Sequence, residues 1–193
     1  MITHIQGKLV EKNPSFVIID CNGIGYFLRI SLQTFSKLSN DEHCMLFTHL
    51  SIKEDAHTLY GFFDKDEREL FRLLISVSGV GPNTAQMILS SLTPHEIQQA
   101  ILTENVSVLQ GVKGIGGKTA QRIILDLKDK IAKLGISANS SSTSYNTIRE
   151  EALSALTMLG FSKNSIEKYI DKELKEDGSV EVEELVKRVL KKM

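Results

Sequence analysis

Two stretches of the chain repeat each other: residues 77–89 read VSGVGPNTAQMIL, and residues 112–124 read VKGIGGKTAQRII. They align without a gap at an offset of 35 residues, with seven identities in thirteen positions. Self-similarity at a fixed offset is the signature of a duplicated supersecondary unit. The repeat therefore predicts two copies of one small unit, and it decides the fold of the middle of the chain.

Each copy predicts a helix, a turn of the form Gly-hydrophobic-Gly, and a second helix. The glycines allow positive φ angles and a close approach of the backbone to a ligand. The central Val80 or Ile115 can turn inward and hold the two helices together. Pro82 suits the first position of a helix, where no N–H is needed, and the N–H groups that open the second helix form a ready anion site. Such a turn can hold a phosphate with few lysines.

This pattern resembles the helix-hairpin-helix motif of proteins that bind DNA without reading its sequence. One copy alone would favour a hairpin whose glycines merely permit tight packing, but two copies with a matched Thr-Ala-Gln favour DNA binding. Lys113, Lys118 and Arg122 add cations to the second copy. The first copy has Asn83 and Met87 in place of Lys118 and Arg122, so it must rely more on backbone donors. The predicted DNA-binding residues are Gly79, Val80, Gly81, Asn83, Thr84, Lys113, Gly114, Ile115, Gly116, Gly117, Lys118, Thr119 and Arg122.

The second turn ends in Gly117-Lys118-Thr119, which is similar to the end of a nucleotide-binding loop. The Walker A spacing, however, needs a glycine where Val112 stands, so the motif does not predict ATP binding. We find no cluster of Asp, Glu and His at the spacing of metal ligands and no catalytic Lys/Asp pair. We therefore expect no cofactor, no metal and no catalytic residue.

The first third of the chain, residues 1–63, has the pattern of a small β-barrel. Short runs rich in Val, Ile, Phe and Tyr occur at residues 9–11, 16–21, 25–30, 44–50 and 58–63, with turn residues between them. Asn22-Gly23 predicts a hairpin, and one short helix fits residues 32–38. Five strands in about sixty residues suit a closed barrel of the OB type better than an open sheet.

The aromatic residues of this barrel raise a second hypothesis, single-strand binding. OB folds that bind single strands use an aromatic strand face, and Tyr26, Phe27 and Phe47 are available. Alternate strand positions must fill the core of a small barrel. We therefore expect these three side chains in the core.

The remainder of the chain is helical in pattern, so the predicted fold class is α+β with several domains. Residues 64–134 have helical apolar spacing, and Thr93-Pro94-His95-Glu96 predicts a capped helix start. Residues 135–145 are largely small, polar and uncharged, which predicts a flexible linker. Residues 146–193 carry three helical patterns, the first ending at Gly160. They predict a three-helix, UBA-like module.

The charge balance and the composition limit the classes of protein to which this chain can belong. The net charge is −1, and residues 1–63, 64–134 and 135–193 hold 5, 9 and 9 Lys+Arg against 6, 8 and 10 Asp+Glu, so no segment is a basic block. DNA binding would then depend on backbone N–H groups and a few placed cations. Cys21 and Cys44 lie in apolar runs and predict buried free thiols of a cytosolic protein. We expect no membrane span and no secretory signal.

Glu54 and Asp55 stand between the last two predicted strands, at the tip of a hairpin. From the residues alone, a solvated turn is favoured. Paired carboxylates can also serve metal-assisted hydrolysis, and a repair nuclease or glycosylase that docks through helix-hairpin-helix motifs is the alternative function. That alternative needs a catalytic constellation, which the sequence does not show.

The acidic hairpin, the two helix-hairpin-helix copies, the polar linker and the terminal Leu159-Gly160-Phe161 segment occur in the order typical of the RuvA family. These are the Holliday-junction-binding subunits of bacterial branch migration, and the chain resembles them over essentially its whole length. The resemblance implies a non-catalytic homotetramer, single or paired, whose concave face binds an open four-way DNA junction. It also implies that Glu54 and Asp55 form an acidic pin at the crossover, where carboxylates repel phosphates.

The same resemblance implies partners for the C-terminal module. RuvA-like proteins recruit a RuvB-type hexameric ATPase through this domain, and a RuvC-type resolvase joins a larger complex. The implied localisation is the bacterial cytoplasm. The candidates for motor contact are Leu156, Leu159, Gly160 and Phe161. The alternative for these residues is a helix C-cap at Gly160, with Phe161 folded back onto the three-helix core.

Overall fold

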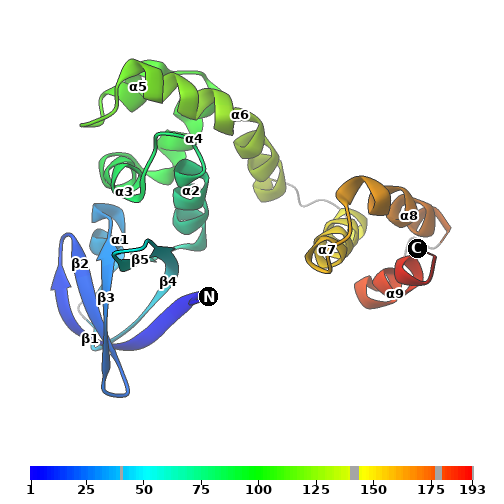
Figure 1. Ribbon diagram of the computed structural model, residues 1–193, viewed down its shortest axis with the longest axis horizontal. Coiled ribbons are helices and arrows are strands. Elements are labelled where there is room, and N and C mark those ends of the chain that lie inside the picture. The colour runs from blue at the N-terminus through cyan, green and yellow to red at the C-terminus, as the bar shows by residue number, and fades with distance from the viewer. Residues whose placement is uncertain (40, 140–143, 177–179, 193) are drawn as a thin grey trace. The chain divides into compact units, whose positions relative to one another are not determined.

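The computed structural model describes residues 1–39, 41–139, 144–176 and 180–192 (Figure 1). The chain divides into two units, Met1–Ile136 and Ser137–Met193, and each is described by itself. Among the described residues, no helix has both the length and the apolar character needed to cross a membrane.

The first unit begins with a closed barrel, as the sequence predicts. Its strands are β1 (His4–Asn13), β2 (Phe16–Cys21), β3 (Ile24–Ile30), β4 (His43–Ile52) and β5 (His57–Phe62). The order around the barrel is β1-β2-β3-β5-β4, and β4 closes on β1. The β3–β5 pairing is parallel and the other described pairings are antiparallel. Between β3 and β4 the chain forms α1 (Leu32–Lys37), close to the predicted helix.

The predicted turn between β2 and β3 is confirmed. Asn22 and Gly23 have φ angles of 56° and 90°, in the left-handed region that these residue types enter most readily. The Gly23 N–H donates to the Asp20 carboxylate at 3.1 Å. Two residues of positive φ match the twist of the flanking strands, which is why Asn-Gly pairs form tight hairpins.

The alternation of β3 decides which aromatic side chains face the core. Leu28 points into the barrel and is fully buried, so its neighbour Phe27 points outward. Phe27 is 50% exposed and stacks on Phe16, with ring centroids 4.8 Å apart. The core prediction is therefore wrong for Phe27. Tyr26 packs partly buried against the barrel core, as predicted. Phe47 lies between the fully buried Leu46 and Thr48 of β4, so it points out of the barrel, where Lys65 and Arg68 lie over its ring, and the core prediction is wrong for Phe47 as well.

The two cysteines are free, as predicted, but they are only partly buried. Both pack at the edge of the barrel core, and the Cys21 thiol donates to the Gln6 carbonyl at 3.2 Å. Burial raises the pKa of the Cys44 thiol. The prediction of fully buried thiols is wrong in degree, because these positions lie where the strands leave the barrel core.

Helices complete the first unit. They are α2 (Lys65–Ile75), α3 (Pro82–Ser91), α4 (Pro94–Leu102), α5 (Val106–Gln110) and α6 (Gly117–Asn139). The helix start predicted at Thr93-Pro94-His95-Glu96 is confirmed, and there Thr93 and Glu96 form a capping box. The barrel interior has a core of its own, and the helical core extends onto β5, since Phe62 of β5 packs with Phe71 of α2 at a centroid distance of 4.9 Å. The part of the helical core shared by β5 and α2 places the helix-hairpin-helix turns relative to the barrel.

The predicted linker begins too early. Helix α6 continues to Asn139, so residues 135–139 are helical, and residues 140–143 lie outside the described part of the chain. A helix that is already nucleated gains one hydrogen bond for each residue it adds, and residues 135–139 contain no proline to end it. Small polar composition alone therefore misplaces the helix end.

The second unit contains α7 (Ser144–Met158), α8 (Lys163–Glu176) and α9 (Val182–Lys192), which correspond to the three predicted helices. Apolar residues from all three helices form its core: Ala152, Leu156, Ile166, Ile170, Leu174, Leu185 and Val189 are buried there. The ion pair between Arg149 of α7 and Asp171 of α8, 2.6 Å from Nε to Oδ1, lies beside this core.

Candidate nucleic-acid interface

The first helix-hairpin-helix copy joins α2 to α3 through residues 76–81. Gly79 has a φ of 88°, a conformation that strains any residue with a Cβ. The Val80 N–H donates to the Val77 carbonyl at 3.0 Å, and the Val80 side chain is buried. Gly81 caps α3 and Pro82 opens it. The first N–H groups of α3 thus have no partner within the helix and are available to an anion.

The second copy joins α5 to α6 with the same backbone pattern. Gly114 has a φ of 89°, and the Ile115 N–H donates to the Val112 carbonyl at 3.1 Å. The Ala120 N–H donates to the Gly116 carbonyl at 3.0 Å, which repeats the bond at the start of α3. The internal repeat in the sequence is therefore a repeat in geometry.

The predicted DNA-binding residues divide into two groups. Val80 and Ile115 are buried, so their side chains position the turns and cannot touch a ligand. The remaining positions lie at the surface: Gly79, Gly81, Asn83, Lys113, Gly114, Gly116, Lys118 and Arg122 are exposed, and Thr84, Gly117 and Thr119 are partly exposed. That these residues contact DNA stays a prediction.

The cations at the second turn are not neutralised within the described part of the chain. Lys113, Lys118 and Arg122 form no ion pair with a described carboxylate, whereas Lys128, further along α6, pairs with Glu104. A cation without a counter-ion gains most from meeting a phosphate. The turn thus combines backbone donors with unpaired positive charge.

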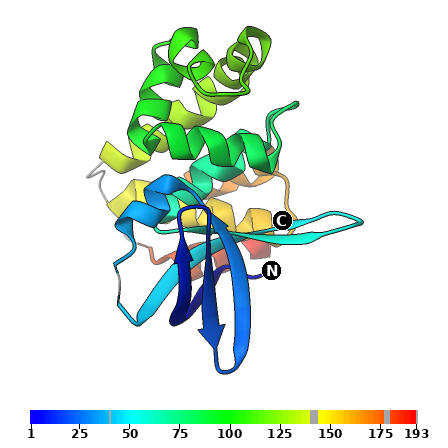
Figure 2. The ribbon, with the colours of Figure 1, turned by 90° about the vertical axis from the view of Figure 1, so that its left-hand side faces the viewer.

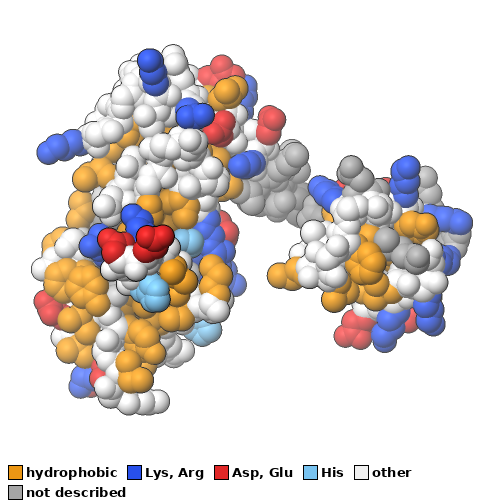
Figure 3. All heavy atoms as spheres, in the orientation of Figure 1, with side chains coloured by type: hydrophobic (Ala, Val, Ile, Leu, Met, Phe, Trp, Pro, Cys, Tyr) orange, Lys and Arg blue, Asp and Glu red, His pale blue; other side chains and the backbone are white. Residues whose placement is uncertain are grey.

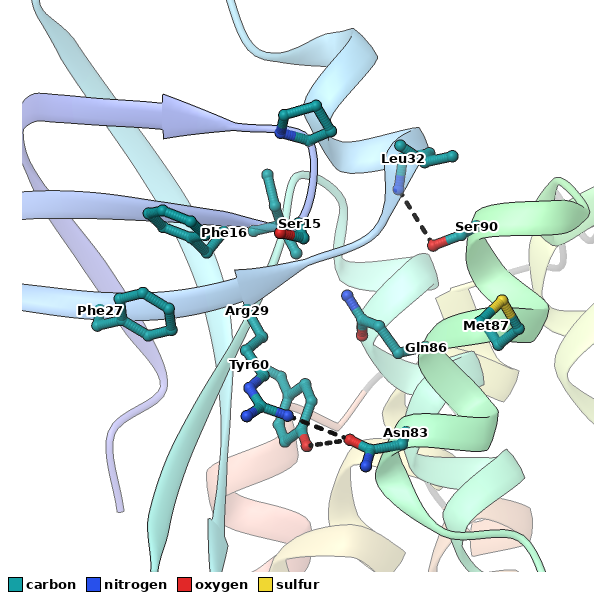
Figure 4. A pocket seen from close by; sticks show the side chains of 12 residues that line it. Ser15, Phe16, Phe27, Arg29, Leu32, Tyr60, Asn83, Gln86, Met87 and Ser90 are labelled. Carbon is teal, nitrogen blue, oxygen red and sulfur yellow. Dashed lines mark hydrogen bonds between the residues drawn. The ribbon is translucent and has the colours of Figure 1, made fainter.

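Sequence reasoning missed one cation beside the first turn, Arg29 of β3. Its Nη1 donates to the Asn83 side-chain carbonyl at 3.2 Å, and the Tyr60 hydroxyl donates to the same oxygen at 3.5 Å. Figure 4 shows the three side chains meeting at one end of a groove of about 560 Å³, which lies between the barrel and α3. A single sequence carries no signal that joins residue 29 to residue 83, because only the closed barrel brings β3 against α3.

The acidic pair lies at the tip of the β4–β5 hairpin, as predicted. The hairpin closes between Lys53 and Ala56, whose N–H groups and carbonyls bond to each other at 2.9 and 3.4 Å. Glu54 and Asp55 are exposed in the turn between them. Figure 2 shows this hairpin extending beyond the body of the barrel, and Figure 3 shows acidic side chains gathered over it. The two exposed carboxylates therefore place negative charge at the tip of a hairpin that projects from the barrel.

The candidate partner surface of the second unit differs from the prediction. Gly160, with a φ of 97°, ends α7 in a Schellman motif, in which the Phe161 N–H donates to the Leu156 carbonyl at 3.2 Å. Leu156 is fully buried, so its side chain cannot offer the motor contact for which it is a candidate. Phe161 packs partly buried against the core, as the alternative of a helix C-cap at Gly160 predicts. Leu159 is 61% exposed, and Met158, which sequence reasoning did not select, is 89% exposed.

Within the described residues, no group of three or more His, Cys, Asp and Glu side chains is placed to hold a metal ion. His49, which the sequence places near the acidic hairpin, instead tilts against Phe71 with ring centroids 5.4 Å apart. Burial and the nearby Arg72 and Arg68 lower the pKa of His49. Its surroundings are those of a structural histidine at the joint between the barrel and α2.

Three family models match the chain: "RuvA N terminal domain" at residues 1–61, "SAM-like Helix-hairpin-helix tandem" at residues 71–129, and "RuvA, C-terminal domain" at residues 147–193. A protein of Christiangramia forsetii named "Holliday junction branch migration complex subunit RuvA" is 55% identical over 193 residues, covering 100% of both chains. The chain belongs to the RuvA family.

Other RuvA proteins match over the same length. Those of Flavobacterium psychrophilum and Cytophaga hutchinsonii carry the same name; each is 51% identical and covers 99% or more of both chains. The RuvA N-terminal model covers the five strands except the last residue of β5, and the helix-hairpin-helix model spans both Gly-hydrophobic-Gly turns. The RuvA family thus accounts for the barrel, the paired turns and the terminal three-helix module in one chain.

Proposed function

We propose that this chain binds four-way DNA junctions without reading their sequence and holds them open for a RuvB-type hexameric ATPase, which drives branch migration in recombination and repair. The observation that carries the proposal is the pair of Gly-hydrophobic-Gly turns with matching hydrogen bonds, in one unit with an exposed acidic hairpin. Membership of the RuvA family supports it, because the relatives are named as subunits of the Holliday junction branch migration complex.

The paired turns suit a duplex backbone. Each turn offers N–H groups at a helix start, where the helix dipole also favours an anion. Contacts to phosphates position a protein on DNA but carry no sequence information, which fits a protein that must hold every arm of any junction. Two turns in one unit can then hold two phosphates across a minor groove, with Lys118 and Arg122 adding charge to the second.

The acidic hairpin would act at the point where strands exchange. Unit charges of the same sign about 4 Å apart repel by about 1 kcal/mol in water, and by more where solvent is excluded. Glu54 and Asp55 would therefore disfavour duplex DNA that runs straight through the centre. They would help to direct separated strands into the exit arms, while the helix-hairpin-helix turns keep hold of the duplex arms.

The remaining parts of the proposal concern assembly. Four chains would surround the junction, as one tetramer or two facing tetramers, and residues 146–193 would recruit the motor, with a RuvC-type resolvase joining a larger complex. In this division of labour residues 1–63 carry the pin and residues 64–134 grip DNA. The chain itself would be non-catalytic, because the ATPase is a separate protein.

A competition gel shift tests the proposal. Labelled four-way junction is challenged with unlabelled junction or with linear duplex of equal length, with and without Mg²⁺, and the mass of the complex is measured in parallel. We expect the junction to compete far better than the duplex, no cleavage, and a mass equal to four or eight chains on the junction. Equal competition would overturn the junction-binding proposal, strand cleavage would favour a nuclease, and a strict monomer on DNA would overturn the assembly.

A further inference from the structure

The two helix-hairpin-helix copies differ in charge although they share a backbone. Helix α6 begins with Gly117-Lys118-Thr119 and carries Arg122 one turn later, whereas α3 has no basic residue along its whole length. Asn83 stands where Lys118 stands in the second copy. The proposed grip of two phosphates would therefore have side-chain cations at one turn and none at the other.

The barrel places a cation at the position that α3 leaves neutral. The guanidinium of Arg29 lies 3.2 Å from the Asn83 carbonyl oxygen, so it occupies the space beside the residue that corresponds to Lys118. Arg29 is exposed, and no described carboxylate pairs with it. Of its N–H groups, the structure engages the one that reaches Asn83 (Figure 4).

We propose that Arg29 is a phosphate ligand and completes the first helix-hairpin-helix copy from outside the motif. This inference rests on the proposed DNA binding and names a residue of that site. The ligand is a phosphodiester of a duplex arm. A guanidinium has five N–H donors in a planar fork, so the bond to Asn83 leaves a donor pair for a bidentate contact with phosphate oxygens.

Asn83 is then a positioning residue rather than a substitute cation. Its carbonyl oxygen accepts from both Arg29 and the buried Tyr60. The Tyr60 contact is long, at 3.5 Å, so the shorter bond from Arg29 is the main one, and through it the amide holds the guanidinium at the start of α3. An arginine held in this way loses less conformational entropy on binding than a free lysine would. The repeat therefore keeps its function in the first copy through a contact between two domains.

A purely structural role for Arg29 is the competing explanation, since its bond to Asn83 also links the barrel to α3. The two roles differ in their dependence on charge. Arg29→Gln removes the cation, and because the glutamine side chain is shorter than arginine it also removes the bond from Nη1 to Asn83. Each neutralised phosphate contributes about 0.9 to the slope of log affinity against log salt. Removal of a phosphate ligand therefore lowers that slope, whereas removal of a structural bond does not.

The experiment measures junction affinity of the full-length chain at several salt concentrations. The variants are Arg29→Gln, Arg29→Gln/Asn83→Lys, and Lys8→Gln as the control; Lys8 is a barrel cation already paired with Glu42 at 2.7 Å. We expect Arg29→Gln to weaken binding about tenfold or more and to reduce the salt slope by about one for each phosphate that is no longer neutralised. The double variant, with a lysine at the position equivalent to Lys118, should recover most of the affinity and the slope. Lys8→Gln should behave as wild type.

The outcomes separate this inference from the function on which it rests. If the wild-type chain fails to prefer the junction, the proposed function fails. If the wild type binds and Arg29→Gln keeps both affinity and slope, only the role of Arg29 is overturned. A loss of affinity with an unchanged slope, or a double variant that restores neither, assigns Arg29 to structure and also overturns the inference. Thermal unfolding of each variant identifies any that lose the fold.

Discussion

Glu67 of α2 accepts a hydrogen bond from the Thr34 hydroxyl of α1 at 2.7 Å, and both side chains are fully buried. The Ser31 hydroxyl donates to the other oxygen of the same carboxylate. Backbone donors orient both hydroxyls: the Thr34 N–H donates to Ser31 Oγ and the Phe63 N–H to Thr34 Oγ1, each at 3.0 Å. A buried carboxylate thus ties the helix of the barrel to the first helix of the helix-hairpin-helix region.

This joint predicts a pH dependence of stability. Burial raises the pKa of Glu67 more than its two hydroxyl partners lower it. A carboxyl whose pKa is raised by folding contributes most stability below its unfolded pKa and loses that contribution as the pH rises through the folded pKa. The contribution of Glu67 to the free energy of unfolding should therefore fall as the pH rises above about 4.5, so the difference in stability between wild type and Glu67→Gln should change with pH. Urea unfolding between pH 4.5 and 7 measures it.

The control for this prediction is Glu69→Gln, which removes a partly exposed carboxylate that pairs with Arg68 and Arg72 on the same helix. Ion pairs near the surface contribute about 0–1 kcal/mol, so this variant should keep the contribution of Glu67 to the pH dependence. Identical pH profiles for Glu67→Gln and wild type would mean that Glu67 does not titrate in this range.

Substitutions of the two glycines in the first turn should separate an effect on stability from an effect on junction binding. Gly79→Ala should lower the free energy of unfolding by about 1–2 kcal/mol, because the φ of 88° strains any residue with a Cβ. Gly81→Ala should change stability by less than about 1 kcal/mol, since its φ is −86° and a Cβ there meets nothing within 4 Å. Its new methyl group should still weaken junction binding by crowding the phosphate. Chemical unfolding and gel shifts on both variants test this, and full binding by Gly81→Ala would remove the turn from the interface.

Removal of the acidic pair in the hairpin should change the rate of branch migration without lowering the affinity for the junction. Glu54→Ala/Asp55→Ala should bind the junction as tightly as wild type or up to about fivefold tighter, because a repulsive charge is removed, while the rate of motor-driven branch migration changes. The matched control is Glu11→Ala, an exposed carboxylate on β1, which should alter neither quantity. Marked loss of junction affinity in the double variant would contradict a repulsive role.

The second unit predicts opposite behaviour for two leucines near the end of α7. Leu156→Ala should lower the stability of this unit by about 2–5 kcal/mol, because Leu156 is fully buried. Leu159→Ala should leave stability within about 0.5 kcal/mol, since Leu159 is 61% exposed, but it should weaken binding to a RuvB-type ATPase. Calorimetry and a binding assay with the motor measure the two effects. Motor binding unchanged by both Leu159→Ala and Met158→Ala would place the contact elsewhere.

Much of the fold could be predicted because its signals are local. The Asn22-Gly23 turn, the capping box at Thr93 and the glycine end of α7 each depend on the φ preference or hydrogen bonding of a few adjacent residues. The end of α6 was missed because helix extension depends on what has already formed rather than on composition. The outward position of Phe27 was missed because apolar character does not say which face of a strand a residue occupies.

By itself, the sequence determined the repeated turns, the acidic hairpin and the order of barrel, helices and terminal module, since each is a pattern of neighbouring residues. Tertiary structure alone decided the relations between distant residues. The tertiary structure buries Glu67 against Thr34 and Leu156 in the core of the second unit. It also places Arg29 beside Asn83, 54 residues further along the chain. The physical reason is that such contacts depend on closure of the barrel and on its shared core with α2, which no local pattern encodes.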